Sequence, residues 1–198
     1  MTIKNLKLFF TLIATIFIAT TVNGQQLYKC DTTKSFWAFS KDSSFFTVKL
    51  LGIAKETEKT SVISLNNYVL QSILIEKTKF IKSGEDNSDL KVLIRFALNE
   101  SEYFSSQFKT KLNTQVQKAP LSADKSVLIW FFEMPPGINQ EVKFQLFANI
   151  IIGNKIFGVG SSQFVDQKFE SVKNLLMDVI STLKIFNDKN DFDKLCGQ

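Results

Sequence analysis

Histidine is absent from this 198-residue chain, which removes several kinds of active site. A Ser-His-Asp triad, a Cys-His pair and most zinc sites need an imidazole, and histidine is the usual general base near neutral pH. Two Ser-x-x-Lys matches, at Ser106–Lys109 and Ser181–Lys184, lack the S-D-N and K-T-G partners of serine acyl-transfer sites. The sequence therefore predicts no catalytic residue, no metal site and no cofactor, and a protein that is not an enzyme.

Arginine is almost absent as well, because Arg95 is the only one. The net charge is +5, and it would be +3 without the two lysines of residues 1–24. Nucleic-acid binding depends on many phosphate contacts and often on the planar guanidinium group. So weak a charge with a single arginine predicts that nucleic acid is not the partner.

An apolar run at residues 8–19 is too short for a transmembrane helix, which needs about 20 such residues. Two lysines precede it, and Val22-Asn23-Gly24 follows with small residues at the positions that signal peptidase reads. Residues 1–24 are therefore predicted to be a cleaved signal peptide, with an uncleaved anchor as the alternative. We expect a secreted or periplasmic protein that starts near Gln25 and has no membrane span.

Only two cysteines are present, Cys30 and Cys196, near the two ends of the predicted mature chain. An exported protein meets an oxidising compartment, where such a pair tends to close. We predict one disulfide between them, with pairing to another molecule as the alternative. A disulfide that closes a loop of this length would raise the free energy of the unfolded chain by about 5 kcal/mol in the chain-entropy model.

The first half of the predicted mature chain contains one clear pair of strands. Residues 35–39 and 45–51 alternate apolar and polar side chains around a polar turn, which predicts a hairpin. The segment from Val62 to Ile81 fits either a helix or a strand. Gly84, Asn87 and Ser88 predict a turn over residues 82–89.

The second half predicts a regular succession of elements. Asn99 and Glu102 have the spacing of a helix capping box, and Asp166 is a candidate helix cap. The predicted order is a strand at 90–98, a helix at 99–117, strands at 127–134, 141–152 and 155–162, and a final helix. The expected inward side chains of this final helix are Phe169, Val172, Leu176, Val179, Ile180 and Leu183.

This order of elements resembles the fold of the photosystem PsbP proteins, the Ran-binding protein Mog1 and their exported bacterial relatives. The resemblance covers Leu90 to Leu183, chiefly the final strand-to-helix stretch from Ile156 through Phe169 to Leu183, with weaker support from the hairpin. It implies an α+β fold, PsbP/Mog1-like, with an antiparallel β-sheet and helices packed on both faces. It implies no activity and no site residue, because proteins with this scaffold mostly act as accessory or binding proteins.

Phenylalanine is abundant, with 20 copies against three tyrosines. These rings fill the space between a sheet and the helices on both its faces, or they line an apolar cavity for a lipid-like ligand. The candidate lining residues of such a cavity are Trp37, Trp130, Phe132 and Phe147. Stacking on sugar rings is a third use of exposed aromatic side chains.

Residues 25–198 carry no linker or repeat, so we expect a single domain after the signal peptide. The preferred function is a non-enzymatic binding or accessory domain that docks on an envelope or extracellular protein. The alternative is a carrier of a hydrophobic small molecule or lipid. Asn99-Glu100-Ser101 is a glycosylation sequon that has meaning only in a eukaryotic secretory pathway.

Overall fold

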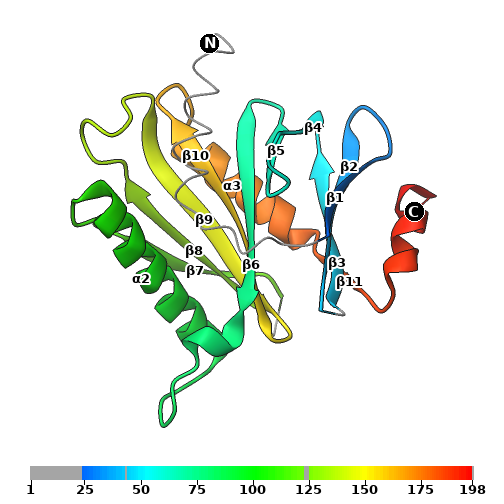
Figure 1. Cartoon of the computed structure of the whole chain (residues 1–198). Coiled ribbons are helices and arrows are strands. Elements are labelled where there is room, and N and C mark those ends of the chain that lie inside the picture. Colours follow the sequence, from blue (N-terminus) through cyan, green and yellow to red (C-terminus); the bar gives the residue numbers. More distant parts are fainter. Residues whose placement is uncertain (1–23, 43, 123–124, 198) are drawn as a thin grey trace.

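The computed structural model describes residues 24–42, 44–122 and 125–197. Within these ranges the chain forms two antiparallel sheets and two α-helices (Figure 1). The predicted signal peptide lies outside the described residues except for Gly24, so it stays a prediction. No helix of the described residues is long and apolar enough to cross a bilayer.

The smaller sheet has the strand order β1-β2-β3-β11 and joins the two ends of the described chain. Its central pair is the predicted hairpin, with Trp37 opposite Val48. At the turn before β2, the Asp31 carboxylate accepts hydrogen bonds from the backbone N–H groups of Thr33 and Lys34. The four strands are β1 (Gln25–Lys29), β2 (Lys34–Lys41), β3 (Ser44–Leu51) and β11 (Lys184–Phe186).

The larger sheet has the strand order β4-β5-β6-β10-β9-β8-β7. Its strands are β4 (Ala54–Glu56), β5 (Val62–Leu65), β6 (Tyr68–Glu76), β7 (Gln115–Pro120), β8 (Ser126–Glu133), β9 (Val142–Ile152) and β10 (Lys155–Phe164). The segment that fitted either a helix or a strand thus forms two strands and the short 3₁₀ helix η1 (Lys77–Phe80). The strands predicted at 127–134, 141–152 and 155–162 are present as β8, β9 and β10.

The first helix, α2 (Asp89–Phe108), corrects two predictions, because residues 90–98 are helical and Asn99 lies inside the helix. The alternation that suggested a strand also fits a helical stripe. Val92 and Phe96 are buried one turn apart, whereas Leu98 is 51% exposed. The helix ends at Phe108 and not near Gln117, since Lys109 takes a left-handed conformation with φ of 52° and residues 115–120 form β7.

The last helix, α3 (Phe169–Ser181), begins three residues after the predicted cap. Asp166 lies in the preceding turn, where the side chain of Gln167 accepts the backbone N–H of Phe164. The predicted inward face is otherwise correct. Four of its six side chains are buried, namely Val172, Leu176, Val179 and Ile180. The other two, Phe169 and Leu183, are half-buried.

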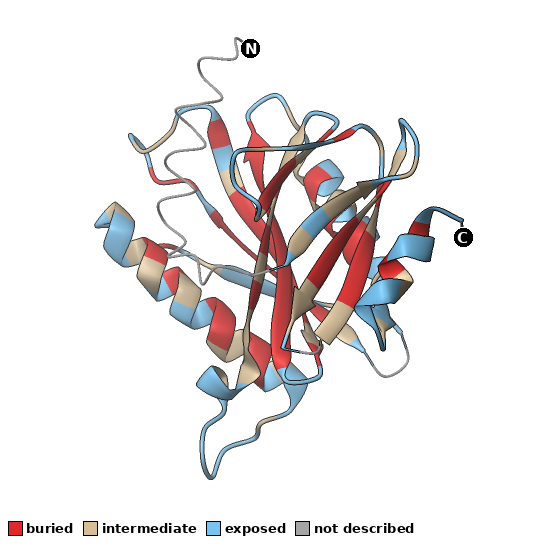
Figure 2. Ribbon diagram, turned by 45° about the vertical axis from the view of Figure 1, so that its right-hand side comes forward, coloured by how far each residue is buried: buried red, intermediate tan, exposed pale blue. Residues whose placement is uncertain are grey.

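The larger sheet is covered on both faces, as the α+β fold predicted (Figures 1 and 2). Helix α2 packs on one face over β8 and β9. The other face is shared by α3 and the smaller sheet, so that Phe39 and Phe46 contact Phe157 of β10. The hairpin therefore belongs to a separate, smaller sheet, which covers the core on the α3 side of the larger sheet.

Cys30 and Cys196 are bonded in the structure, with an S–S distance of 2.00 Å. The second of them belongs to the 3₁₀ segment η2 (Lys189–Gly197), which packs beside β1 and β2. Phe192 and Leu195 of this segment are buried against Ala38. The predicted pairing thus ties the C-terminal end of the described chain to its first strands.

Candidate functional site

The four aromatic residues proposed for one apolar cavity lie on opposite faces of the larger sheet. Trp37 of β2 belongs to the core beneath the smaller sheet, whereas the other three lie under α2. The rings of Trp130 and Phe147 stack with their centroids 4.1 Å apart. The ring centroids of Phe132 and Phe104 lie 5.3 Å apart. The structure brings these three together as packed side chains and separates Trp37 from them.

Two glycines let the α2-side core pack closely against β10. A Cβ atom on Gly158 would lie 2.0 Å from the Asn149 amide nitrogen, and one on Gly160 would lie 2.6 Å from the Phe147 ring. Asn149 in turn accepts a hydrogen bond of 2.7 Å from the indole nitrogen of Trp130. These glycines therefore serve cross-strand packing.

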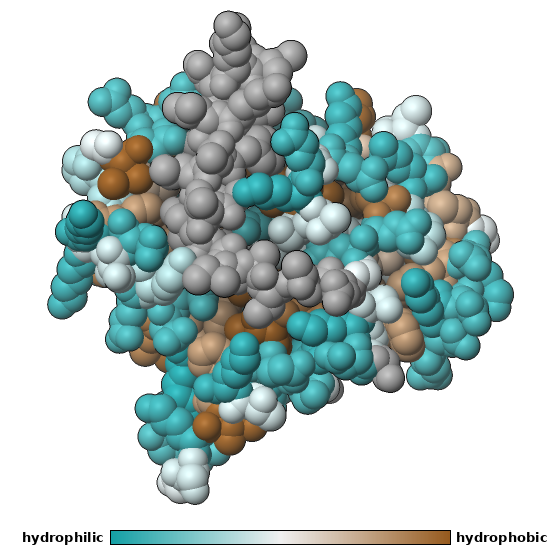
Figure 3. All heavy atoms as spheres, viewed as in Figure 1, coloured by the Kyte–Doolittle hydropathy of each residue, from teal (hydrophilic) through white to brown (hydrophobic). Residues whose placement is uncertain are grey.

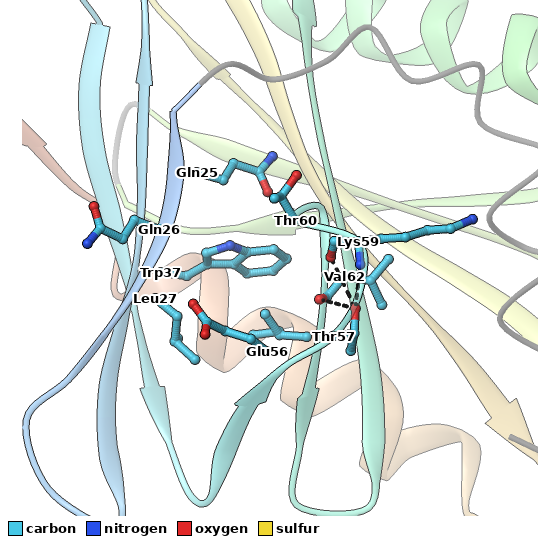
Figure 4. Close-up of a pocket in the computed structure, with 10 residues that line it drawn as sticks. Gln25, Gln26, Leu27, Trp37, Glu56, Thr57, Lys59, Thr60 and Val62 are labelled. Carbon is cyan, nitrogen blue, oxygen red and sulfur yellow. Dashed lines mark hydrogen bonds between the residues drawn. The ribbon is translucent and has the colours of Figure 1, made fainter. Parts of the chain in front are cut away.

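Trp37 instead lines a pocket between the two sheets, shown in Figure 4. The pocket has a volume of about 270 Å³ and lies between the first strands of the smaller sheet and the β4–β5 connection. Its lining residues are Gln25, Gln26, Leu27, Trp37, Glu56, Thr57, Lys59, Thr60, Val62 and Ile63. Of this set only Trp37 was predicted as a lining residue, because segments far apart in the sequence supply the rest.

The β4–β5 connection is held in shape by the hydroxyl of Thr57. That oxygen lies 2.8 Å from the carbonyl oxygen of Val62, and it accepts the backbone N–H of Lys59 at 3.2 Å. The apolar wall of the pocket comes from buried or half-buried side chains, and Trp37 is only 1% exposed. The pocket therefore has an ordered wall on the β4–β5 side.

Gln25 lines this pocket and also contacts the larger sheet. Its side-chain oxygen accepts a hydrogen bond from the Ser72 hydroxyl at 3.1 Å, which links β1 to β6. Its amide nitrogen is buried and makes no hydrogen bond. Leaving a buried donor unpaired costs about 1–3 kcal/mol. This nitrogen has no accessible surface, so it is not presented to a ligand in the pocket.

The polar and charged side chains of the pocket point in different directions in Figure 4. Gln25 and Thr60 lie on one side of the Trp37 ring, and the Glu56 carboxylate lies on the other. The side chain of Lys59 extends away from the ring. Within the described part of the chain the Glu56 carboxylate makes no ion pair, so it is an available acceptor.

Other charged side chains are engaged in structural contacts. Lys155, with a side chain only 2% exposed, lies 2.5 Å from Glu76 and 3.0 Å from Asp42 and so joins β10 to the turn between β2 and β3. Burial opposes its charge, but the hydrogen bonds and charges of Glu76 and Asp42 outweigh that effect and raise the pKa of Lys155. These groups hold the two sheets together.

Arg95 is likewise occupied, although a lone arginine could have gripped an anion. Its guanidinium donates to four acceptors of the loop before α2, namely the Phe80 carbonyl, the Glu85 carboxylate, the Asp86 carbonyl and the Asn87 side chain. No planar, forked cation is therefore left for an outside ligand.

Glu100 has the largest change in acidity, since burial raises its pKa to about 7. The residue lies one helical turn from both Phe96 and Phe104, on the packed face of α2. In the described residues no side-chain hydrogen bond reaches it, and no group of three metal-ligating side chains is found. A single buried carboxyl without a neighbouring acid or nucleophile is not a catalytic arrangement.

Strand β7 is an exposed edge of the larger sheet. Over the described ranges it pairs only with β8, and residues 115–118 are exposed, with Val116 at 42%. Three exposed lysines, Lys109, Lys111 and Lys118, lie on this strand or just before it and form no ion pair with described residues. This edge was not predicted from the sequence, because the apolar stripe Phe104, Phe108, Leu112 and Val116 extended the predicted helix to Gln117.

No protein-family model matches the sequence, and no curated protein matches it as a relative. The structure is similar to the solution structure of cyanobacterial PsbP (CyanoP) from Synechocystis sp. PCC 6803, with a TM-score of 0.53. The sequence identity is 14%, and the match covers 79% of this chain and 94% of that chain. The chain therefore shares the PsbP-like α+β fold, as the order of its elements predicted.

Proposed function

We propose that this chain is an exported, non-enzymatic binding domain that docks on a protein partner through strand β7. An extended segment of the partner would add to the free edge of the larger sheet beside residues 115–118. The single observation that carries this proposal is the exposed edge strand, whose backbone groups on that side pair with no other strand of the described residues. The PsbP-like fold supports the non-enzymatic part, and the disulfide supports export.

The other end of the sheet shows how proteins protect such an edge. There the last strand, β4, has only three residues, which is too short to template another chain. Strand β7 has six residues and no proline before Pro120. Strand β7 is therefore the longer of the two edges and can pair with an added strand over more residues.

The charge around β7 indicates the chemistry of the partner. Lys109, Lys111 and Lys118 are exposed, and no acidic residue occurs between Tyr103 and Ser122. We infer an extended partner segment that carries Asp or Glu side chains. The described part of the face in Figure 3 is mostly hydrophilic with scattered apolar side chains.

The alternative function, a carrier of a hydrophobic molecule, has less support. The three aromatic residues under α2 contact one another directly, and the pocket at Trp37 has polar groups on both sides of the indole. An acyl chain would leave those polar groups unpaired.

A photo-crosslinking residue at Gln117 tests the docking proposal in the organism that makes the protein. We expect one discrete crosslinked polypeptide, and none from the same residue at Lys55 on β4. The variant with Lys109→Glu, Lys111→Glu and Lys118→Glu should lower the yield about tenfold or more. Equal crosslinking from both positions would contradict the proposal.

A matched charge control separates specific pairing from general attraction. Lys29, Lys55 and Lys79 are also exposed, and their replacement by Glu changes the net charge equally far from β7. This variant should keep the crosslink at Gln117. An equal loss in both triple variants would mean that net charge, and not the edge strand, controls the interaction.

A further inference from the structure

We propose that strand β7 takes an antiparallel partner strand in one register, with an acidic side chain opposite Lys118 and an apolar side chain opposite Val116. This inference rests on the proposed docking function and specifies the partner segment of that same site. Because an antiparallel partner runs from Lys118 toward Val116, its motif is acidic-x-apolar, in the direction from its N-terminus to its C-terminus.

Pro120 shows which backbone groups of β7 face away from β8. It has no N–H to donate, so its pair with β8 is one of the non-hydrogen-bonded pairs of the ladder. The backbone N–H of Leu121 donates to the Lys125 carbonyl at 2.9 Å, as expected for the position next to such a pair. Bonded and non-bonded pairs alternate along an antiparallel ladder. The N–H and C=O groups of Val116 and Lys118 therefore also point away from β8, to the outer side of the sheet.

These outward backbone groups are available to an added strand. Over the described ranges β7 pairs with β8 alone, and the outward groups of Val116 and Lys118 make no hydrogen bond to a described residue. An antiparallel strand beside them would form two backbone hydrogen bonds with each of the two residues. The register of the partner is therefore set by Val116 and Lys118.

The side chains of the same two residues indicate the chemistry of the partner. Val116 lies opposite Trp130, which belongs to the core under α2. Lys118 lies opposite Leu128 of the same core, so both side chains are on the α2 face of the sheet. A partner residue directly opposite each of them has its side chain on that face too. An apolar side chain there covers Val116, which is 42% exposed, and a carboxylate pairs with the exposed Lys118.

Three further features narrow the choice of partner. Gln117 is exposed and uncharged and lies on the other face of β7, so the middle residue of the motif is left open. All the strand pairs of the described residues are antiparallel, which favours this direction for an added strand. A second copy of this chain is the poorer occupant, because β7 against β7 would bring a second Lys118 to the same face, where like charges repel.

Binding of two capped peptides to the purified protein, with its disulfide intact, tests the order of the motif. The peptides are Ser-Thr-Glu-Thr-Val-Thr-Ser and its reverse, Ser-Thr-Val-Thr-Glu-Thr-Ser, which have the same composition and charge. NMR titration should show that the first binds about fivefold more tightly, with the largest amide shifts at Val116 and Lys118. Equal binding, tighter binding of the reversed peptide, or no binding of either would overturn this inference.

Methylation of single backbone nitrogens in the first peptide tests the hydrogen-bond register. In the proposed pairing the N–H of the peptide's valine faces β7, whereas the N–H of its central threonine faces away. Methylation of the valine nitrogen should therefore weaken binding about tenfold or more. Methylation of the central threonine nitrogen is the matched control and should preserve binding. An equal loss from both methylations would contradict the register.

A charge exchange tests the pair at Lys118. The variant Lys118→Glu should prefer a peptide with lysine in place of glutamate, whereas the wild type should prefer the glutamate peptide, each by about fivefold. Lys55→Glu changes the net charge equally at an exposed position of β4, and it should retain the wild-type preference. The same reversal in both variants would show that net charge controls binding and would overturn the assigned pair.

The motif and the docking function can fail separately. A discrete crosslink at Gln117 without any preference among the peptides would support docking and remove the acidic-x-apolar motif. Sedimentation of the free protein tests the second copy as the occupant. A dimer in which the Val116 amide exchanges slowly with deuterium would assign the edge to a second copy and overturn this inference, whereas a monomer with rapid exchange at Val116 supports it.

Discussion

At the scale of single residues, Thr47 of β3 is a buried hydroxyl without a hydrogen-bond partner. Valine has nearly the same shape and no polar atom, so Thr47→Val should raise the free energy of unfolding by about 0.5–1 kcal/mol. Urea unfolding of the two proteins measures this difference. Thr182, whose hydroxyl accepts the backbone N–H of Lys49 at 2.8 Å, is the control, and its valine variant should be less stable.

Glu100 gives the molecule a pH dependence whose sign is fixed by its raised pKa. Between pH 4.5 and 7 the native carboxyl keeps a proton that the unfolded chain has released. The free energy of unfolding contributed by this group therefore falls as the pH rises through that window, and it changes no further above it.

The variant Glu100→Gln removes this titration. Above pH 7 it should be more stable than the wild type by about 1–2 kcal/mol, after allowance for partial exposure, and below pH 4.5 the two should be equal. Denaturant unfolding across the pH range checks this. Glu102→Gln, at an exposed position of the same helix, is the matched control for the loss of one carboxylate. A difference that stays constant with pH would show that Glu100 titrates normally.

At the scale of elements, Arg95 fastens the loop of residues 81–88 to α2. Lysine keeps the charge but cannot reach several acceptors in one plane, so Arg95→Lys should cost about 1–3 kcal/mol of unfolding free energy. The loop should also become more sensitive to limited proteolysis. Lys91→Ala, at an exposed position of the same helix, should change neither property. Unchanged cleavage of the loop in Arg95→Lys would contradict this role.

Strand β9 was predicted correctly and helix α2 was not, and particular residues show the physical reason. In β9 every second side chain from Val142 to Ile152 is apolar over eleven residues, and no helical stripe competes with that pattern. In α2 the alternation from Val92 to Leu98 is too short to exclude a helix, and Ala97 and Phe104 complete a helical face. The end of α2 depended on Lys109 in a left-handed conformation, which lysine seldom signals in a sequence.

At the scale of the whole molecule, the Cys30–Cys196 bond closes a loop with a sequence separation of 166. Replacing both cysteines with serine should lower the free energy of unfolding by about 3–5 kcal/mol, because the unfolded chain gains freedom. Thermal unfolding with and without reductant measures the same effect in the wild type. An unchanged melting temperature after complete reduction would show that the bond adds no stability.

The C-terminal segment η2 separates the effect of the bond from the effect of packing. Phe192 lies 6.0 Å from Tyr28 and 5.5 Å from Phe186, measured between ring centroids. These contacts should keep η2 against the smaller sheet even in the double serine variant. The native near-ultraviolet circular dichroism should therefore persist below the melting temperature.

The α+β class, most strands, the inward face of α3 and the cysteine pairing could be predicted from the amino-acid sequence, because they follow from local periodicity and from the presence of only two thiols. Three facts became visible only in the folded chain: Trp37 faces a different core from Trp130, Gln25, Glu56 and Thr60 line one pocket, and β7 is an open edge among the described strands. Each of those facts depends on which strands become neighbours, and strand order follows from long-range packing that no local pattern contains.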